Sequence, residues 1–536
     1  MTSLRRPLGA ALLAFLLALP AFAVLKAHSE RHYAVSHAQA IGIARADENV
    51  GPVLRRRGYT TVRVSPIDRD QQRVSFFNGP RLVLHAAVSE QRRVTHMAVR
   101  APGVQQSGSL IANYHSVLII TSLLFVLALA TVPLVSLRNL DVLAFASFTA
   151  PVWLMNDGFI YLTVLAAYPA VAYLTLRCLA FGLRGGGREP RRSLYWHVTS
   201  RLAAGPRRRV VGALVAGMAV VVALVTVTST GPSDVAFAAL AGATDLVHGV
   251  VPYGHIPDFI LHGDTYPLLT YAVYVPGAAV MPVRDFFDDP QGALVIAAFA
   301  ALLGAGMLYR LAARSSSAAA ETGDEPPRVT GLRTALAWLA FPPVLLTASS
   351  GSNDVVLAVF VLAALFATAH RARSAVLIGV AAWVKVIPLL ALPVWLARMN
   401  GRGIARSLAG LAALSAILTG WIVALGGFSA IGTMVHALGF QFDRGSLSSL
   451  WVGLGLGWLQ PAAEAALVAA VVAATLAVRR DRDLRDDLPR LAALLAGIIL
   501  LAQFAANYWT WAYLPWAIAP ALVVLVRRRA VVAAAA

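Results

Sequence analysis

Residues 207–234 read RRRVVGALVAGMAVVVALVTVTSTGPSD, and this stretch indicates the fold class of the whole chain. Three arginines come first, an apolar run from Val210 to Val227 follows, and Gly231-Pro232-Ser233-Asp234 closes the stretch. An apolar run of about 17 to 25 residues crosses a bilayer as an α-helix, and arginine clusters mark the cytoplasmic end of such helices. The pattern therefore predicts a transmembrane helix that places Asp234 at the extracytoplasmic surface.

Similar apolar runs recur along the chain. Its 536 residues are 58% apolar and 13% charged, with a mean hydropathy of +0.69, which excludes an ordinary water-soluble domain. The net charge of +19 comes from arginines clustered between apolar runs, so it indicates cytoplasmic anchors rather than nucleic-acid binding. Spans are expected near Leu8–Val24, Ser116–Val135, Asp141–Met155, Phe159–Leu179, Val210–Val227, Gly292–Leu308, Ala335–Thr347, Val355–Ala369, Ile404–Leu425, Ala462–Ala477, Leu491–Gln503 and Ala512–Leu525.

The expected fold is an all-α polytopic membrane protein with about 12 transmembrane helices plus re-entrant segments. The re-entrant or hairpin segments are Pro267–Val283 and Ala375–Leu396, because a single crossing by either would invert the charge pattern downstream. The predicted organisation is a signal peptide or first membrane anchor (1–26), an extracytoplasmic α+β domain (27–115), transmembrane helices (116–182), a basic cytoplasmic linker (183–209) and the main transmembrane domain (210–536).

The exported domain is predicted from the polar stretch between His28 and His115. A helical pattern covers His37 to Arg56, and strand-like runs follow at Thr60–Val64, Arg73–Phe77 and Arg81–Val88. Upstream, Ala21-Phe22-Ala23 resembles a signal-peptidase site, and the stretch is exported whether or not cleavage occurs there. A helix followed by antiparallel strands is similar to the PepSY-type extracytoplasmic module.

This topology gathers the unusual polar residues on the external face. Asp234 sits at the membrane surface, where a carboxylate can accept a proton from an acceptor hydroxyl, although a helix cap is an equally simple role for it. The other external polar residues are Asp245, Asp258, Asp264, Asp354, Asp443, His248, His255 and His262. Because no repeated halves are visible, an alternating-access carrier is not favoured.

The first external loop carries a family resemblance. Asp234, Leu240-Ala241-Gly242, His248-Gly249 and Pro252-Tyr253-Gly254 resemble the first luminal loop of the C-type membrane glycosyltransferases. The pattern is most similar to the polyprenol-phosphate-mannose-dependent α-(1→2)-mannosyltransferases of glycosyltransferase family 87, and to actinobacterial relatives that carry an N-terminal module. The resemblance implies that Asp234 is the catalytic aspartate and that His248 belongs to the substrate site.

Two further segments resemble the family in the expected order. The segment from His262 to Leu268, with Asp264 and Tyr266, is similar to the tyrosine-proline segment that lines the family's site. Asn353-Asp354 opens a helix on the external side, where the helix dipole favours the Asp354 carboxylate and where Asn353 could simply be a cap.

Two cations follow, each in a context similar to the family's phosphate-binding residues. Lys385 lies inside an apolar segment before Pro388, at a cost of about 2.5 to 3.5 kcal/mol, so it needs an anionic partner. That partner is either a lipid phosphate or a structural aspartate. Gln441 and Arg444 match the family's Gln-x-x-Arg-x-Ser loop, and the arginine's planar fork suits a phosphate diester, or else snorkels to the interface.

Tyr508 and Trp509 open the last span, near Tyr513 and Trp516. These aromatic residues form either an interfacial belt or, as the family's Tyr-Trp segment implies, a face for the sugar or prenyl chain. His255, Asp258 and His262 have a spacing compatible with metal ligation, but no cofactor or metal is expected. Without a Walker loop or a Gly-x-Ser-x-Gly elbow, ATP-driven transport and serine hydrolysis are unsupported.

The expected function is transfer of a hexose, mannose by the resemblance, from a polyprenyl-phosphate donor to a hydroxyl of a cell-envelope glycan or glycolipid. The expected location is the extracytoplasmic face of the plasma membrane, with inversion at the anomeric carbon because one base acts without a covalent nucleophile. Two other classes stay open: a transporter or flippase of lipid-linked sugars, and a membrane-bound regulator acting through the exported domain.

Overall fold

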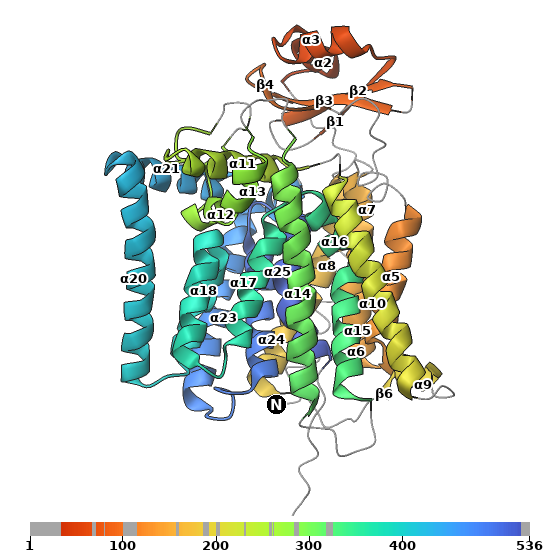
Figure 1. Cartoon of the computed structure of the whole chain (residues 1–536), viewed down its shortest axis with the longest axis vertical. Helices are drawn as coiled ribbons and strands as arrows, with labels where there is room; N and C mark the ends of the chain where they lie inside the picture. The colour runs from red at the N-terminus through yellow and green to blue at the C-terminus, as the bar shows by residue number, and fades with distance from the viewer. Residues whose placement is uncertain are drawn as a thin grey trace, which may run out of the picture.

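The computed structural model describes residues 34–526, except 67–70, 80, 100–114, 157–159, 186–191, 200–203, 230–231, 257–259, 261, 284–288, 318–324 and 447. The first anchor, predicted at Leu8–Val24, and the Ala21-Phe22-Ala23 site lie outside these residues. Figure 1 shows a tall helical bundle with a small α+β domain above one end.

The N-terminal domain packs two helices on one face of an antiparallel sheet with strand order β1-β2-β3-β4. Val74, Phe76 and Leu84 are fully buried between the sheet and the helices, and Ser36 with Gln39 forms a capping box at the first helix. The three predicted strands are present, and the fourth was not anticipated. The elements are α2 His37–Ala46, α3 Val50–Arg57, β1 Thr61–Pro66, β2 Gln71–Asn78, β3 Arg81–Ser89 and β4 Val94–Val99.

Helices of very different length form the bundle. The first part of the chain contributes α5 His115–Leu129, α6 Leu137–Ala146, α7 Thr149–Asn156, α8 Ile160–Arg184, α9 Leu194–Val198, α10 Ala204–Val227, α11 Asp234–Val247, α12 Leu268–Ala272, α13 Val275–Val280 and α14 Gln291–Ser317. A two-stranded ribbon, β5 Thr131–Val132 with β6 Arg192–Ser193, joins two of the loops.

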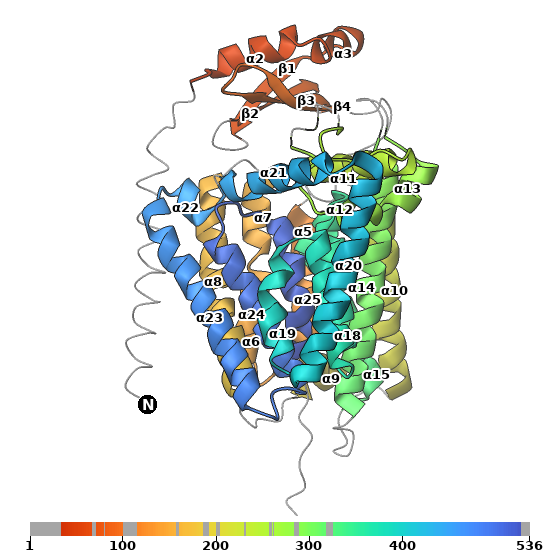
Figure 2. The same cartoon turned by 90° about the vertical axis from the view of Figure 1, so that its left-hand side faces the viewer.

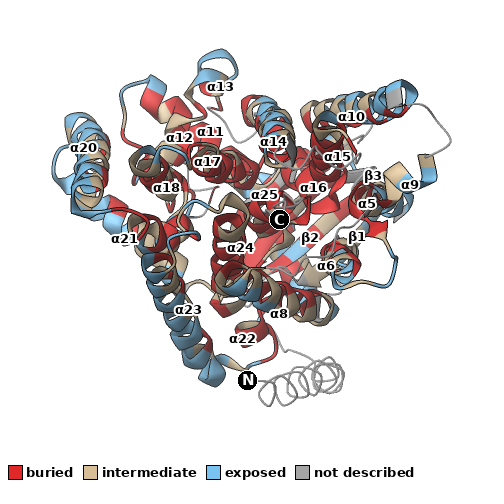
Figure 3. Ribbon diagram, turned by 90° about the horizontal axis from the view of Figure 1, so that it is seen from below, coloured by how far each residue is buried: buried red, intermediate tan, exposed pale blue. Residues whose placement is uncertain are grey.

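The second part of the chain contains α15 Pro327–Ala340, α16 Pro342–Ser349, α17 Asp354–Phe366, α18 Arg371–Val384, η3 Ile387–Ala391, α19 Leu392–Leu396, α20 Gly401–Gly426, α21 Ser429–Asp443, α22 Leu450–Gly453, η4 Gly457–Leu459, α23 Gln460–Arg480, α24 Leu488–Ala505, η5 Trp511–Tyr513 and α25 Leu514–Leu525. Seen along the bundle, α17, α24 and α25 are mostly buried, while α10, α20 and α23 expose much of their surface at the rim (Figure 3).

Six helices among the described residues are long and apolar enough to cross a membrane, and a bent pair would make a seventh. This is fewer than the twelve expected crossings, because several expected spans are short or broken. The expected span Asp141–Met155 is divided between α6 and α7, and Ala335–Thr347 bends by 57° between α15 and α16, where Pro342 and Pro343 follow each other.

The segment Ala375–Leu396 forms the hairpin that the charge pattern predicts. Helix α18 ends at Val384, Lys385 breaks the helix, and η3 with α19 returns toward the starting side, where Arg371 Nη1 donates to the carbonyl oxygen of Arg398 at 2.8 Å. The other predicted re-entrant segment, Pro267–Val283, forms only the short helices α12 and α13. These lie beside α11 (Figures 1 and 2).

The two ends of the bundle differ in character. Helices α11, α12, α13 and α21 lie at the end that faces the N-terminal domain (Figure 2). At the other end, arginines tie loops together: Arg371 pairs with Asp486, Arg398 Nε donates to the Arg485 carbonyl at 2.7 Å, and Arg479 Nη1 donates to the Met399 carbonyl at 2.7 Å. Residues predicted to be external and internal therefore separate to opposite ends.

Candidate active site

A buried ion pair joins α17 to the break in the hairpin. Asp354 begins α17 and pairs with the ammonium of Lys385, and both side chains are nearly inaccessible to solvent. The carboxylate also accepts hydrogen bonds from Ser352 Oγ at 2.5 Å and from Trp516 Nε1 at 3.0 Å. These contacts join three distant segments: the start of α17, the break after α18 and the start of α25.

Aromatic rings surround the ammonium of Lys385. Its Nζ lies 5.5 Å from the ring centre of Tyr266, 5.2 Å from that of Tyr513 and 5.0 Å from that of Trp516. Tyr513 and Trp516 stack with ring centres 4.3 Å apart. Ring faces attract cations, so the cage stabilises the charge of Lys385 while leaving N–H groups that do not point at Asp354.

Arg444 is the second cation of this cluster. It caps the C-terminus of α21, and its guanidinium lies flat on Tyr508, 3.4 Å from the ring centre, with Nη2 donating to Tyr513 Oη at 3.4 Å. Tyr513 thus contacts Arg444 and faces Lys385, which brings the two predicted phosphate-binding residues to one site. Stacking fixes the plane of the guanidinium and so fixes the directions in which its N–H groups can donate.

Asp234 approaches the same cluster from α11, whose first residue it is. Ser233 caps this helix through its Oγ, and its backbone N–H donates to the Ser350 carbonyl at 2.8 Å, which fastens the helix start to the turn before Asp354. Gly351 permits this contact, since a Cβ there would lie 2.8 Å from that of Ala236. The Asp234 side chain is exposed, and its charge acts on both Arg444 and Lys385.

Buried tyrosines hold the loop that carries Tyr266. Tyr253 Oη donates to the Tyr266 carbonyl at 3.1 Å, while Tyr271 Oη accepts from the Tyr266 N–H at 3.3 Å and donates to the Gly263 carbonyl at 2.8 Å. Gly242 makes room for the Tyr271 ring, because a Cβ there would lie 2.4 Å from it. The loop and α11 are therefore packed as one unit.

Four of the predicted site residues have contacts with residues other than the two cations. Gln441 Nε2 donates to Thr265 Oγ1 at 2.5 Å, and Asp264 Oδ2 accepts from the Gly254 N–H at 3.1 Å. Trp509 is fully buried against Tyr168, with ring centres 5.9 Å apart. His248 ends α11, and its Nδ1 lies 2.7 Å from the Thr244 carbonyl.

Asn353 occupies the N-cap position of α17 without acting as a cap through its side chain. The residue is completely buried, and neither its Oδ1 nor its Nδ2 has a hydrogen-bond partner among the described residues. A buried amide without partners costs free energy, so the position of Asn353 next to Asp354 points to a polar group that is supplied from elsewhere.

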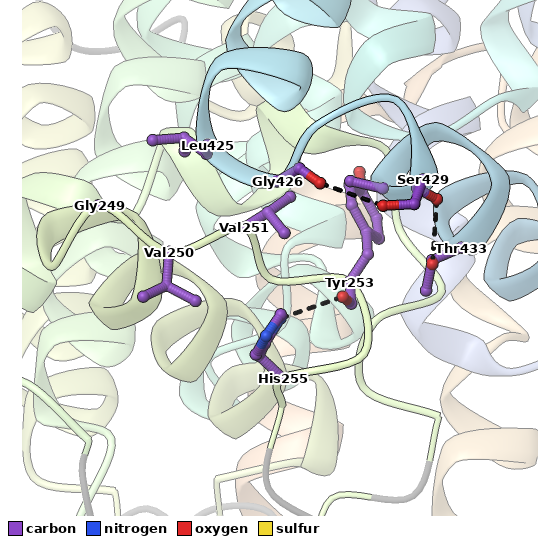
Figure 4. A pocket seen from close by; sticks show the side chains of 10 residues that line it. Gly249, Val250, Val251, Tyr253, His255, Leu425, Gly426, Ser429 and Thr433 are labelled. Atoms are coloured by element: carbon purple, nitrogen blue, oxygen red, sulfur yellow. Dashed lines mark hydrogen bonds between the residues drawn. The ribbon is translucent and has the colours of Figure 1, made fainter.

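A second polar group lies at the far end of α11. Burial raises the pKa of Asp245 to about 6, against the opposing effect of His255 and His248. Nearby, a cavity of about 380 Å³ is lined by Tyr253, His255, Ser429 and Thr433 among others (Figure 4). The cavity does not include Asp234, Lys385 or Arg444. No group of three or more potential metal ligands is found in the described part of the chain, and Asp258 lies outside it.

Sequence reasoning named Tyr513 and Trp516 only as neighbours of the aromatic stretch and did not select Ser352. The structure makes all three part of the cluster: Ser352 and Trp516 donate to Asp354, and Tyr513 contacts Arg444. A usable signal was present, because Tyr513 and Trp516 are three residues apart at a helix start and so share one face.

The comparison with known families matches residues 265–503 to the model of glycosyltransferase family 87. This segment contains Tyr266, Asn353, Asp354, Lys385 and Arg444, whereas Asp234 lies just before it. The match supports that family, whose members are membrane glycosyltransferases. No curated protein and no solved structure matches the chain.

Proposed function

We propose that this protein is a membrane glycosyltransferase that uses a polyprenyl-phosphate hexose as donor. The observation that supports this most directly is the cluster itself: two cations, Lys385 and Arg444, lie against aromatic rings, and Asp234 at the start of α11 offers an exposed carboxylate. The family match covers both cations. A lipid-phosphate head group with an attached sugar fits this combination, because cations bind the phosphate and ring faces pack against the sugar.

Lys385 and Arg444 are the proposed phosphate-binding residues. Lys385 has N–H groups beyond the one that pairs with Asp354, and the fork of Arg444 is held flat by Tyr508. As the bond between the anomeric carbon and the phosphate oxygen breaks, negative charge grows on the phosphate. Two fixed cations stabilise that charge without having to reorganise.

Asp234 is the proposed general base. It takes the proton from the acceptor hydroxyl while the hydroxyl oxygen forms its bond to the anomeric carbon, and the polyprenyl phosphate leaves on the opposite side. With one base and no covalent nucleophile, this displacement inverts the configuration at the anomeric carbon. The side chain is exposed at the start of α11, which leaves it accessible to an acceptor.

The rings of Tyr266, Tyr508, Tyr513 and Trp516 are proposed to contact the hexose and the first prenyl units. Mannose is the hexose that the sequence resemblance implies, and the acceptor is a hydroxyl of a cell-envelope glycan or glycolipid. We propose that the reaction occurs on the extracytoplasmic side of the plasma membrane, and the position of the cluster at the bundle end opposite the arginine-tied loops supports this proposal.

The test measures sugar transfer by membranes that contain the expressed protein. The membranes are given radiolabelled polyprenyl-phosphate mannose or, separately, the glucose and arabinose analogues. Product formation with one donor names the sugar. Asp234→Asn should lower the rate by about 10² to 10⁴, whereas the matched control Asp289→Asn, an exposed carboxylate beside α14, should leave it unchanged. An Asp234→Asn variant that inserts normally and transfers at the parental rate would favour the flippase class.

A further inference from the structure

The N-terminal domain presents a basic face toward the candidate active site. Its helices α2 and α3 cover one side of the sheet, and the other side faces the bundle in both side views (Figures 1 and 2). Seen along the bundle, β1 and β2 lie behind α16 and α24, near the middle of the molecule (Figure 3). The sheet therefore lies over the part of the bundle that contains α16 and neighbours α25.

Strand register decides which side chains this face carries. Val74 and Phe76 of β2 are buried under the helices, so the alternate residues Arg73, Ser75 and Phe77 point the other way. Arg63 of β1 pairs with Ser75 in the register, and its guanidinium lies 5.3 Å from the Phe77 ring. Two arginines thus project from the side of the sheet that faces the bundle.

Of these two arginines, Arg73 is the one whose guanidinium is affected by the charge of Asp234. Its side chain is solvent-accessible, yet the protein atoms around it lower the pKa of its guanidinium by desolvation, and the Asp234 carboxylate opposes that shift. Because Arg73 projects from the side of the sheet that faces the bundle, it lies in the space between the two domains.

Charge balance indicates what Arg73 is for. In the cluster, Lys385 pairs with Asp354, and the formal charges of Arg444 and Asp234 are opposite, so these four side chains sum to zero. A phosphate diester brings one additional negative charge into this partly desolvated site. An uncompensated charge there is unfavourable, and Arg73 supplies one compensating cation from above.

Resting on the proposed function, we propose that the N-terminal domain forms the outer wall of the active site and that Arg73 helps bind the anionic head group of the lipid-linked substrate. Arg73 then acts as a substrate-affinity residue contributed by a domain that the family match does not include. The domain then has a direct role in substrate binding, distinct from that of a separate regulatory module.

Binding of polyprenyl monophosphate to the full-length protein in detergent tests this role. Arg73→Gln should weaken binding by roughly threefold to fivefold, with the difference shrinking at high salt, and Arg73→Lys should restore most of it. The control is Arg56→Gln, an exposed arginine on α3 at the far side of the domain. Equal affinity of Arg73→Gln and Arg56→Gln would overturn the inference, whereas a parental protein that binds no polyprenyl phosphate would overturn the proposed function as well.

A cross-linking experiment tests the placement without relying on substrate. In a Cys178→Ala background, a bifunctional maleimide should join Arg73→Cys to Val235→Cys, and should not join Arg56→Cys to Val235→Cys. Failure of the first pair, or equal yields for both pairs, would show that the sheet does not cover Asp234.

Discussion

Lys385 and Asp354 form an ion pair between a helix break and a helix start that are 31 residues apart in the chain. Each has further stabilising neighbours: aromatic rings around the lysine, and Ser352 and Trp516 as donors to the aspartate. The pair is therefore the structural ion pair that an intramembrane lysine requires, and in the proposed function Lys385 also binds the donor phosphate.

Removing one member of this pair should destabilise the folded protein more than removing both. Asp354→Asn or Lys385→Met leaves a buried charge without its partner, at a cost of about 3 to 5 kcal/mol, whereas the double variant leaves none. In detergent, the thermal unfolding midpoint of the double variant should be higher than that of either single variant, although all three variants should fail to transfer sugar. Single variants as stable as the parent would show that the pair is not buried.

Arg444→Lys should impair donor use while leaving the fold intact. Lysine keeps the charge but loses both the flat contact with Tyr508 and the planar fork, so we expect kcat/KM for the donor to fall by about tenfold or more. Arg402→Lys, an exposed position at the opposite end of the bundle, is the matched control. Equal kinetics for the two variants would remove Arg444 from the site.

Gly242→Ala should disturb the site through Tyr271. The added Cβ meets the Tyr271 ring, which must shift and release the loop of Tyr266, at a cost of about 1 to 3 kcal/mol. Gly432→Ala offers the contrast, because its Cβ meets nothing and alanine favours the helix by about 0.5 to 1 kcal/mol. Unfolding midpoints that move in opposite directions, with transfer lost only in the first variant, are the expected result.

Asp245→Asn should stabilise the protein above pH 6 and have little effect near pH 4. Because burial raises the pKa of Asp245 to about 6, the folded state holds its proton more tightly than the unfolded chain does. The carboxyl is therefore neutral and harmless at low pH, and its ionisation destabilises the fold as pH rises from about 4 to 6. Partial exposure limits the gain to about 1 kcal/mol, which unfolding midpoints at pH 4.5 and pH 7.5 would detect. A gain in stability that is the same at both pH values would show that Asp245 does not have a raised pKa.

Sidedness can be measured directly. In a Cys178→Ala background, Ser429→Cys at the start of α21 should react with a membrane-impermeant maleimide in intact cells, whereas Asp483→Cys, in the loop before α24, should react only after permeabilisation. The reverse pattern would place the cluster on the cytoplasmic side and would exclude an externally acting enzyme.

Local patterns account for the parts of the fold that were predicted. The length of an apolar run and the arginines beside it are properties of adjacent residues, so the span α10, the position of Asp234 at its end and the hairpin at Lys385 could all be predicted. The break between α6 and α7 was missed, since the composition of Asp141–Met155 resembles a continuous span. Strand β4 was also missed, because it is short and directly follows a polar turn.

By itself, the sequence determined that the chain is a membrane protein and that Lys385 must find an anion, because burial of a charge in hydrocarbon is unfavourable wherever it occurs. Only the tertiary structure decided that this anion is Asp354, that Trp516 supports it from 162 residues away, and that Gln441, Asp264, Trp509 and His248 make supporting contacts. Partners from remote segments meet through packing of whole helices, which no local pattern records.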